Sequence, residues 1–115
     1  MLQRTKRFAL DVIRLFSSLP RVIVAQVLGR QLLRAGTSVG AHYREACRAK
    51  SNADFISKIE SALQELDEST YWLELVEEAQ IARSPQVQPL KTEANELIAI
   101  FVSVVRSVKS SGLRK

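Results

Sequence analysis

Apolar side chains recur at every third or fourth position through most of this 115-residue chain, and no stretch alternates for long with a period of two. No Asn-Gly or Asp-Gly pair marks a β-hairpin turn. The pattern predicts four amphipathic helices, at about residues 5–18, 21–49, 53–81 and 90–108. Short turns between such helices predict an all-α, antiparallel, up-down-up-down four-helix bundle, in one domain that spans residues 1–115.

Proline and polar residues mark the predicted helix ends. Pro20 follows the first helix, and Ser51 with Asp54 three residues later resembles an N-cap followed by an acid in the first turn. The two prolines of residues 84–89 are predicted to lie in a connection, because the interior of a helix does not tolerate proline. Residues 110–115 are predicted to fray.

The predicted core faces of the helices combine branched and aromatic side chains. They contain Phe8, Val12, Leu15, Phe16 and Leu19, then Phe55, Ile56, Ile59, Ala62, Leu63, Leu66, Thr70, Leu73 and Val76, and then Leu90, Ala94, Leu97, Ile98, Phe101, Val104, Val105 and Val108. The second and third helices are predicted to be about twice as long as the first, which leaves part of their apolar surface uncovered in one copy. Val22, Ile23, Val24, Val27 and Leu28 make the start of the second helix apolar nearly all round, and self-association would cover it.

Residues 31–55 predict a helix with two unlike faces. A polar row consists of Gln31, Arg34, Ser38, His42, Glu45 and Arg48, beside an apolar row of Leu32, Gly36, Val39, Tyr43, Ala46 and Cys47. Small residues such as Gly36 and Gly40 would let another backbone or a ligand approach closely. Arg34 and Glu45 are too far apart to pair, so each needs a partner on another helix or subunit. We therefore predict an oligomer interface at Gln31, Arg34, Ser38, His42, Glu45 and Glu68, with a solvated stripe as the alternative.

The net charge of +5 hides a division along the chain. Residues 1–50 hold ten Lys or Arg and two acids, residues 51–81 hold one Lys and eight acids, and residues 82–115 hold six Lys or Arg and two acids. An acidic third helix that packs against basic neighbours would neutralise part of both charges. The high isoelectric point is therefore weaker support for nucleic-acid binding than it first suggests.

Cations outside this neutralised region are the candidate nucleic-acid ligands. They are Arg4, Lys6, Arg7, Arg44, Arg48, Lys50, Arg106 and Lys109, with Arg114 and Lys115 at the end of the chain. Binding to phosphate requires cations but no particular spacing. The alternative is that these residues only keep the protein soluble.

Few residues in the sequence are suited to catalysis. It has no GxxxxGK or HExxH motif, and it has a single histidine, His42, and a single cysteine, Cys47. Cys47 is predicted to be a small buried apolar residue. We expect a noncatalytic protein with no cofactor and no metal. Charged residues interrupt every apolar run near the start, and no run is long enough to span a membrane, so we expect a cytoplasmic protein.

The chain resembles the bacterial four-helix-bundle proteins encoded in intervening sequences of 23S rRNA genes. The matching residues are Gln31, Leu32, Arg34, Ala35, Ser38, Val39, Ala41, Tyr43, Glu45, Ser51, Asp54, Phe55, Ala62, Glu68, Tyr71, Trp72, Leu73 and Leu75. His42 and Ala46 depart from the family pattern, which has Asn and Gly there. The resemblance implies a ring-shaped homopentamer, a relationship to the accessory protein of diversity-generating retroelements, which binds a reverse transcriptase and nucleic acid, and no established enzymatic activity.

We therefore expect a noncatalytic oligomeric adaptor whose basic surface binds RNA or DNA, with the docking of a nucleic-acid enzyme such as a reverse transcriptase as a second expected role. The alternative is a structural protein–protein interaction module with no role in nucleic-acid binding. In that case the charges would only order the subunits.

Overall fold

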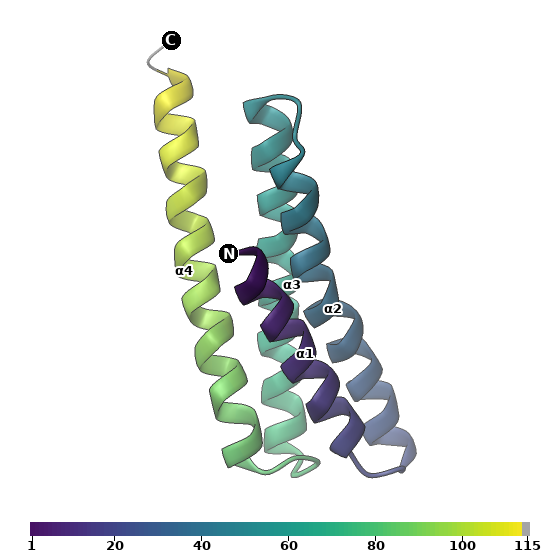
Figure 1. The fold of residues 1–115 in the computed structure, drawn as a ribbon. Helices are drawn as coiled ribbons and strands as arrows, with labels where there is room; N and C mark the ends of the chain where they lie inside the picture. The colour runs from purple at the N-terminus through teal and green to yellow at the C-terminus, as the bar shows by residue number, and fades with distance from the viewer. Residues whose placement is uncertain (114–115) are drawn as a thin grey trace.

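The computed structural model describes residues 1–113 and contains four helices, with no strand among these residues. They are α1 (Leu2–Ser18), α2 (Ile23–Cys47), α3 (Asn52–Glu78) and α4 (Ser84–Leu113). The helices lie side by side in an elongated bundle with extents of 54 × 21 × 20 Å. The α1–α2 and α3–α4 turns lie at one end, and the α2–α3 turn lies at the other (Figure 1). The predicted all-α four-helix bundle is confirmed.

The bundle core is built from the apolar positions that recur with the helical period. Fully or almost fully buried side chains include Phe8, Val12, Leu15, Leu32, Val39, Ile59, Leu66, Leu73, Val76, Leu97 and Phe101. The remaining predicted core residues are buried or partly buried, and most of them belong to the same core or pack against it. Burying one large aliphatic or aromatic side chain stabilises a fold by about 1.5–3 kcal/mol, so this shared interior holds the helices together.

Glycines allow α1 to lie close to α2. A methyl group at Gly36 would lie 2.8 Å from Val12 Cγ2, and one at Gly29 would lie 2.8 Å from side-chain atoms of Phe16 and Leu19. Such distances are too short for a methyl group, so the two helix backbones depend on glycine at both positions. The close approach of another backbone, predicted from the small residues of α2, is thus confirmed, and the partner is α1.

The start of α3 is as predicted. Ser51 is the N-cap, and its hydroxyl accepts a hydrogen bond of 3.0 Å from the backbone N–H of Asp54. The Asp54 carboxylate in turn accepts a bond of 3.3 Å from the backbone N–H of Lys50. α3 ends at Glu78, where Gln80 has a φ of 60° and the N–H groups of Ile81 and Ala82 both bond to the carbonyl of Val76.

The prediction that residues 84–89 form a connection is wrong, because α4 begins at Ser84. Pro85 lies in the first turn, where a backbone N–H has no helical partner, so the proline costs nothing there. The carbonyl of Arg83 accepts hydrogen bonds from Gln86 and Val87, and Val87 is fully buried. Pro89 therefore removes only one hydrogen bond from a helix that packing holds in place. The predicted end of this helix at residue 108 is wrong as well, since α4 continues to Leu113, while 114–115 lie outside the described residues.

α1 covers only part of the bundle's length. Its N-terminus lies about halfway up the molecule, and α2, α3 and α4 continue beyond it (Figure 1). Thr5 of α1 faces Gly40 of α2, while α2 continues to Cys47. In this region Tyr43 of α2 stacks on Phe101 of α4, with 5.6 Å between ring centroids.

Candidate functional site

A network of charged side chains joins α2 to α3. Arg34 Nη2 lies 2.7 Å from Glu68 Oε1, and Arg34 Nη1 lies 3.3 Å from Glu65 Oε2. The prediction that Arg34 needs a partner on another helix is confirmed, and that partner lies within the same chain. Glu65 is the better buried of the two acids, with a side chain that is 12% exposed. Glu65 was not among the residues predicted for the oligomer interface.

His42 and Glu45 extend this network toward the end of α2. His42 Nδ1 lies 2.9 Å from Glu45 Oε1, and His42 Nε2 lies 3.7 Å from Glu65 Oε2. Lys58 Nζ on α3 lies 3.7 Å from Glu45 Oε2. Four residues predicted for the oligomer interface, Arg34, His42, Glu45 and Glu68, thus belong to one network. The other two stand outside it, because the Ser38 hydroxyl donates to the Arg34 carbonyl at 2.7 Å and Gln31 is exposed.

Two of the predicted nucleic-acid ligands already have carboxylate partners. Arg4 Nε lies 2.7 Å from Glu93 Oε2, and Arg4 Nη2 lies 2.8 Å from Glu96 Oε1, so both acids raise the pKa of Arg4. Lys109 Nζ lies 3.6 Å from Glu60 Oε2. A phosphate group would have to compete with these carboxylates for the two cations. Arg4 and Lys109 are therefore weaker candidates than the sequence suggested.

Of the other predicted ligands, Arg114 and Lys115 lie outside the described residues, and the six within them are exposed. They are Lys6, Arg7, Arg44, Arg48, Lys50 and Arg106, and none makes an ion pair with another residue of the described part of the chain. The last turns of α2, the α2–α3 turn and the last turns of α4 lie at the same end of the bundle (Figure 1). These segments carry Arg44, Arg48, Lys50 and Arg106, and we call this end the basic end.

At the opposite end of the bundle, the start of α2 presents exposed apolar side chains. Val22, Ile23, Val24 and Val27, around the start of α2, are 56%, 82%, 59% and 52% exposed. The predicted uncovered apolar surface is therefore present in the single copy. We call these four residues the apolar end. The two ends of the molecule thus differ in chemistry.

A groove of about 410 Å³ runs between α1 and α2. It is lined by Leu2, Gln3, Thr5, Lys6, Ala9, Thr37, Gly40, Ala41 and Arg44. The hydroxyls of Thr5 and Thr37 donate to carbonyls of their own helices. Lys6 and Arg44 are the only charged side chains that line the groove, one from each helix. The sequence alone did not predict that these two cations lie near one another, because that depends on how α1 packs on α2.

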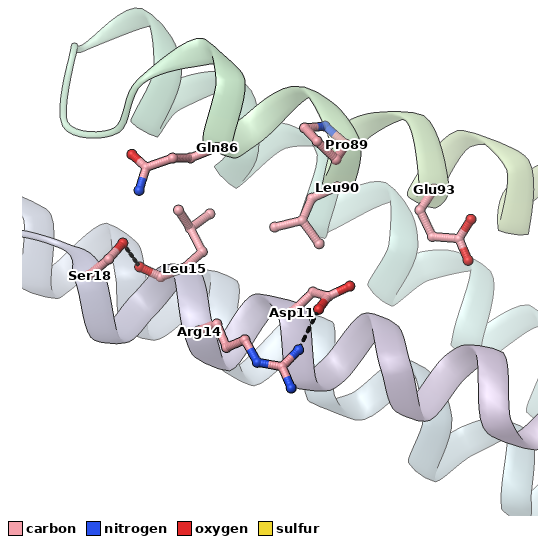
Figure 2. A pocket seen from close by; sticks show the side chains of 8 residues that line it. All are labelled: Asp11, Arg14, Leu15, Ser18, Gln86, Pro89, Leu90 and Glu93. Atoms are coloured by element: carbon pink, nitrogen blue, oxygen red, sulfur yellow. Dashed lines mark hydrogen bonds and ion pairs between the residues drawn. The ribbon is translucent and has the colours of Figure 1, made fainter.

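The other side of α1 carries charges of both signs. One groove of about 400 Å³ is lined by Asp11, Arg14, Leu15, Ser18, Gln86, Pro89, Leu90 and Glu93. Leu15 and Leu90 point toward one another across it, and Arg14 bonds to Asp11 at 2.7 Å (Figure 2). A neighbouring groove shares Asp11 and Glu93 and is also lined by Arg4 and Arg7. The predicted ligands of α1 are thus divided between its two sides, with Arg4 and Arg7 on one and Lys6 on the other.

The prediction that Cys47 is buried is wrong, because Cys47 is exposed. It is the last residue of α2, two turns beyond the contact between Gly40 and Thr5. Tyr43, one turn before it, is partly buried, and this burial together with the neighbouring Cys47 raises the pKa of Tyr43. Among residues 1–113, no three His, Cys, Asp or Glu side chains are grouped closely enough to bind a metal ion. No helix in that part of the chain is both long and apolar enough to cross a membrane.

Comparison with known proteins identifies relatives of this bundle. The family model described as 23S rRNA-intervening sequence protein matches residues 1–103. A crystal structure of a protein of unknown function from the S23 ribosomal protein family of Bacteroides thetaiotaomicron superimposes with a TM-score of 0.82 and 33% identity. The match covers 90% of this chain and 96% of that one. No curated protein matches the sequence. The chain therefore belongs to the family of 23S rRNA-intervening sequence proteins.

Proposed function

We propose that this protein is a noncatalytic, homo-oligomeric adaptor of the cytoplasm that binds RNA or DNA through its basic end. The observation that carries the proposal is that four of the predicted ligands, at the basic end, are exposed cations without ion pairs among the described residues. Cations that are not neutralised within the protein can replace counterions along a phosphate backbone. Such binding is independent of base sequence, because phosphates carry no sequence information.

The assembly that we propose is a ring of antiparallel bundles, with five copies by resemblance to the family. Two features support self-association. The apolar end leaves four branched side chains more than half exposed, which is unusual for a surface without a partner. The network around Arg34 and His42 offers a fixed arrangement of charges to a neighbouring copy. A ring would place several basic ends on one particle and so strengthen binding to a long nucleic acid.

Docking of a nucleic-acid enzyme, such as a reverse transcriptase, is the second part of the proposal. It follows from the resemblance to the accessory protein of diversity-generating retroelements. A protein–protein module without nucleic-acid binding is the competing function, and the exposed apolar end favours it. In that case the basic end would be a solvated surface.

Fluorescence anisotropy with a labelled RNA tests the proposal, measured from about 50 to 200 mM salt. We expect binding at low salt that weakens steeply as salt rises. The double variant Arg48→Glu/Lys50→Glu should lose most of this affinity, whereas Arg21→Glu/Arg83→Glu, with the same change in net charge near the other end, should keep it. Absence of RNA and DNA binding by the wild-type protein at low salt would overturn the proposal and favour the protein–protein module.

A further inference from the structure

We infer that the α1–α2 groove is a binding site for the sugar–phosphate backbone of a single-stranded nucleic acid. This inference rests on the proposed function and assigns it a location and a strand type. The groove lies between α1 and α2, on the side of α1 away from α4, and is lined by Lys6 and Arg44.

Charge distinguishes this groove from the two grooves along α4. Lys6 and Arg44 lie in it without a carboxylate, so a bound anion meets no repulsion from the lining. Along α4, by contrast, Asp11 and Glu93 line both grooves and already engage Arg14 and Arg4. A phosphate in those grooves would lie beside carboxylates and would have to displace existing ion pairs. The α1–α2 groove is thus the one of the three that suits an anion.

The shape of the groove determines which nucleic acid it admits. Ala9, Gly40 and Ala41 are small, so a ligand can lie close to the helix backbones. A volume of about 410 Å³ is in the range of sites for small molecules, which suits a short length of one strand. A double helix could touch only the rim of such a groove. The extended apolar side chain of Leu2 provides a surface for a sugar or a base edge.

The lining also determines base preference. Proteins that bind single strands tightly stack bases on aromatic side chains, and no aromatic side chain lines this groove. Binding must then come from the two cations and from contact with the strand backbone. We therefore expect oligouridine and oligoadenosine to bind with affinities within about threefold of one another.

Two kinds of variant test the site, with fluorescein-labelled single-stranded oligouridine as the probe. Lys6→Gln/Arg44→Gln removes both cations and should lower the affinity by on the order of 10-fold or more. It should also reduce the magnitude of the slope of log K against log salt by about 1.4, since each single-strand phosphate contact contributes about 0.7. Ala41→Leu narrows the groove without changing charge, and it should also lower the affinity.

Matched controls place the same changes elsewhere. Arg21→Gln/Arg83→Gln removes two exposed cations near the apolar end, and Ala99→Leu adds the same bulk to an exposed position of α4. Both should bind oligouridine like the wild-type protein. If the groove variants bind as well as these controls, the groove is not the site, while the proposed function stands. If duplex RNA shows the same loss with the groove variants, the assignment to single strands is wrong. If the wild-type protein does not bind oligouridine or duplex RNA at low salt, the proposed function fails together with the groove.

Discussion

Single residues decide how closely α1 approaches α2. Gly36→Ala would place a methyl group 2.8 Å from Val12 Cγ2, and Val12 is a stiff, fully buried side chain. We expect the free energy of unfolding to fall by about 1–2 kcal/mol, measured by urea denaturation, even though alanine favours a helix. Gly40→Ala is the matched control, because its methyl group would meet Thr5 Oγ1 at an ordinary 3.4 Å. Equal stability of the two variants would contradict this packing.

Glu77 makes the stability of the protein depend on pH. Hydrogen bonds from Ser84, Gln88 and Lys91 lower the pKa of Glu77 from 4.5 to about 2. A lowered pKa in the folded state stabilises the protein above the unfolded pKa, and this stabilisation is lost as pH falls through the folded pKa. Between about pH 5 and pH 2, the urea midpoint should therefore fall less steeply in Glu77→Gln than in the wild-type protein. Parallel pH profiles would show that Glu77 has no such role.

Contacts of single residues could be predicted where they follow from the helical period of one helix. They could not be predicted where they depend on how far a neighbouring helix extends. The need of Arg34 for a partner on another helix was evident, because no acid lies one turn away on its own face. The exposure of Cys47 was not, because the helical period places it beside Ala46 but does not reveal that α1 begins at Leu2, near Arg44, and does not extend as far as Cys47. For the same reason, the sequence did not predict that Lys6 and Arg44 line the same groove.

At the scale of elements, the start of α3 depends on one hydroxyl. Ser51→Ala removes the acceptor for the backbone N–H of Asp54, which should cost about 1 kcal/mol in the free energy of unfolding. Ser57→Ala, at an exposed position one turn and a half later, is the control and should change stability by less than about 0.5 kcal/mol. Chemical denaturation measures both. A Ser51→Ala variant as stable as the control would mean that the cap contributes nothing.

Helix boundaries show what local sequence signals can and cannot predict. The cap at Ser51 combines a hydroxyl with an acid three residues later, and this local signal is specific. The start of α4 was mispredicted because two prolines are typical of a connection. Val87 lies between these prolines and Leu90 follows the second, and burial of both side chains stabilises a helix through this segment. Tertiary packing thus overrode a local preference, which no single-helix pattern could reveal.

At the scale of the whole molecule, the α2–α3 network connects folding to assembly. Arg34→Glu would place a third carboxylate beside those of Glu65 and Glu68. Because like charges repel, we expect this variant to assemble less well and to have a lower molar mass by light scattering. The exchange Arg34→Glu/Glu68→Arg restores a pair of opposite charges and should restore most of the mass. Circular dichroism checks that both variants remain helical. An unchanged mass in Arg34→Glu would assign this face to solvent.

The overall architecture was the most predictable feature, because four amphipathic periods joined by short turns have few ways to share one core. The chemistry of the two ends of the bundle was less predictable. Exposed valines at the start of α2 could be foreseen from an apolar run, but the pairing of Arg4 and Lys109 with carboxylates, which leaves other cations unpaired, required the structure. This arrangement separates a basic surface from an apolar one, and it is the basis of the proposed adaptor.

The separation of assembly from nucleic-acid binding is tested most directly by size-exclusion chromatography with light scattering, with RNA present at low salt. The measurement gives the molar mass of the particle and, from its absorbance, the amount of RNA that it retains. We predict that Arg48→Glu/Lys50→Glu keeps the wild-type protein mass and elutes without RNA, while the wild-type protein carries RNA. A variant that retains RNA at the wild-type level, or one that loses RNA only because its assembly is lost, would contradict a basic end dedicated to nucleic acid.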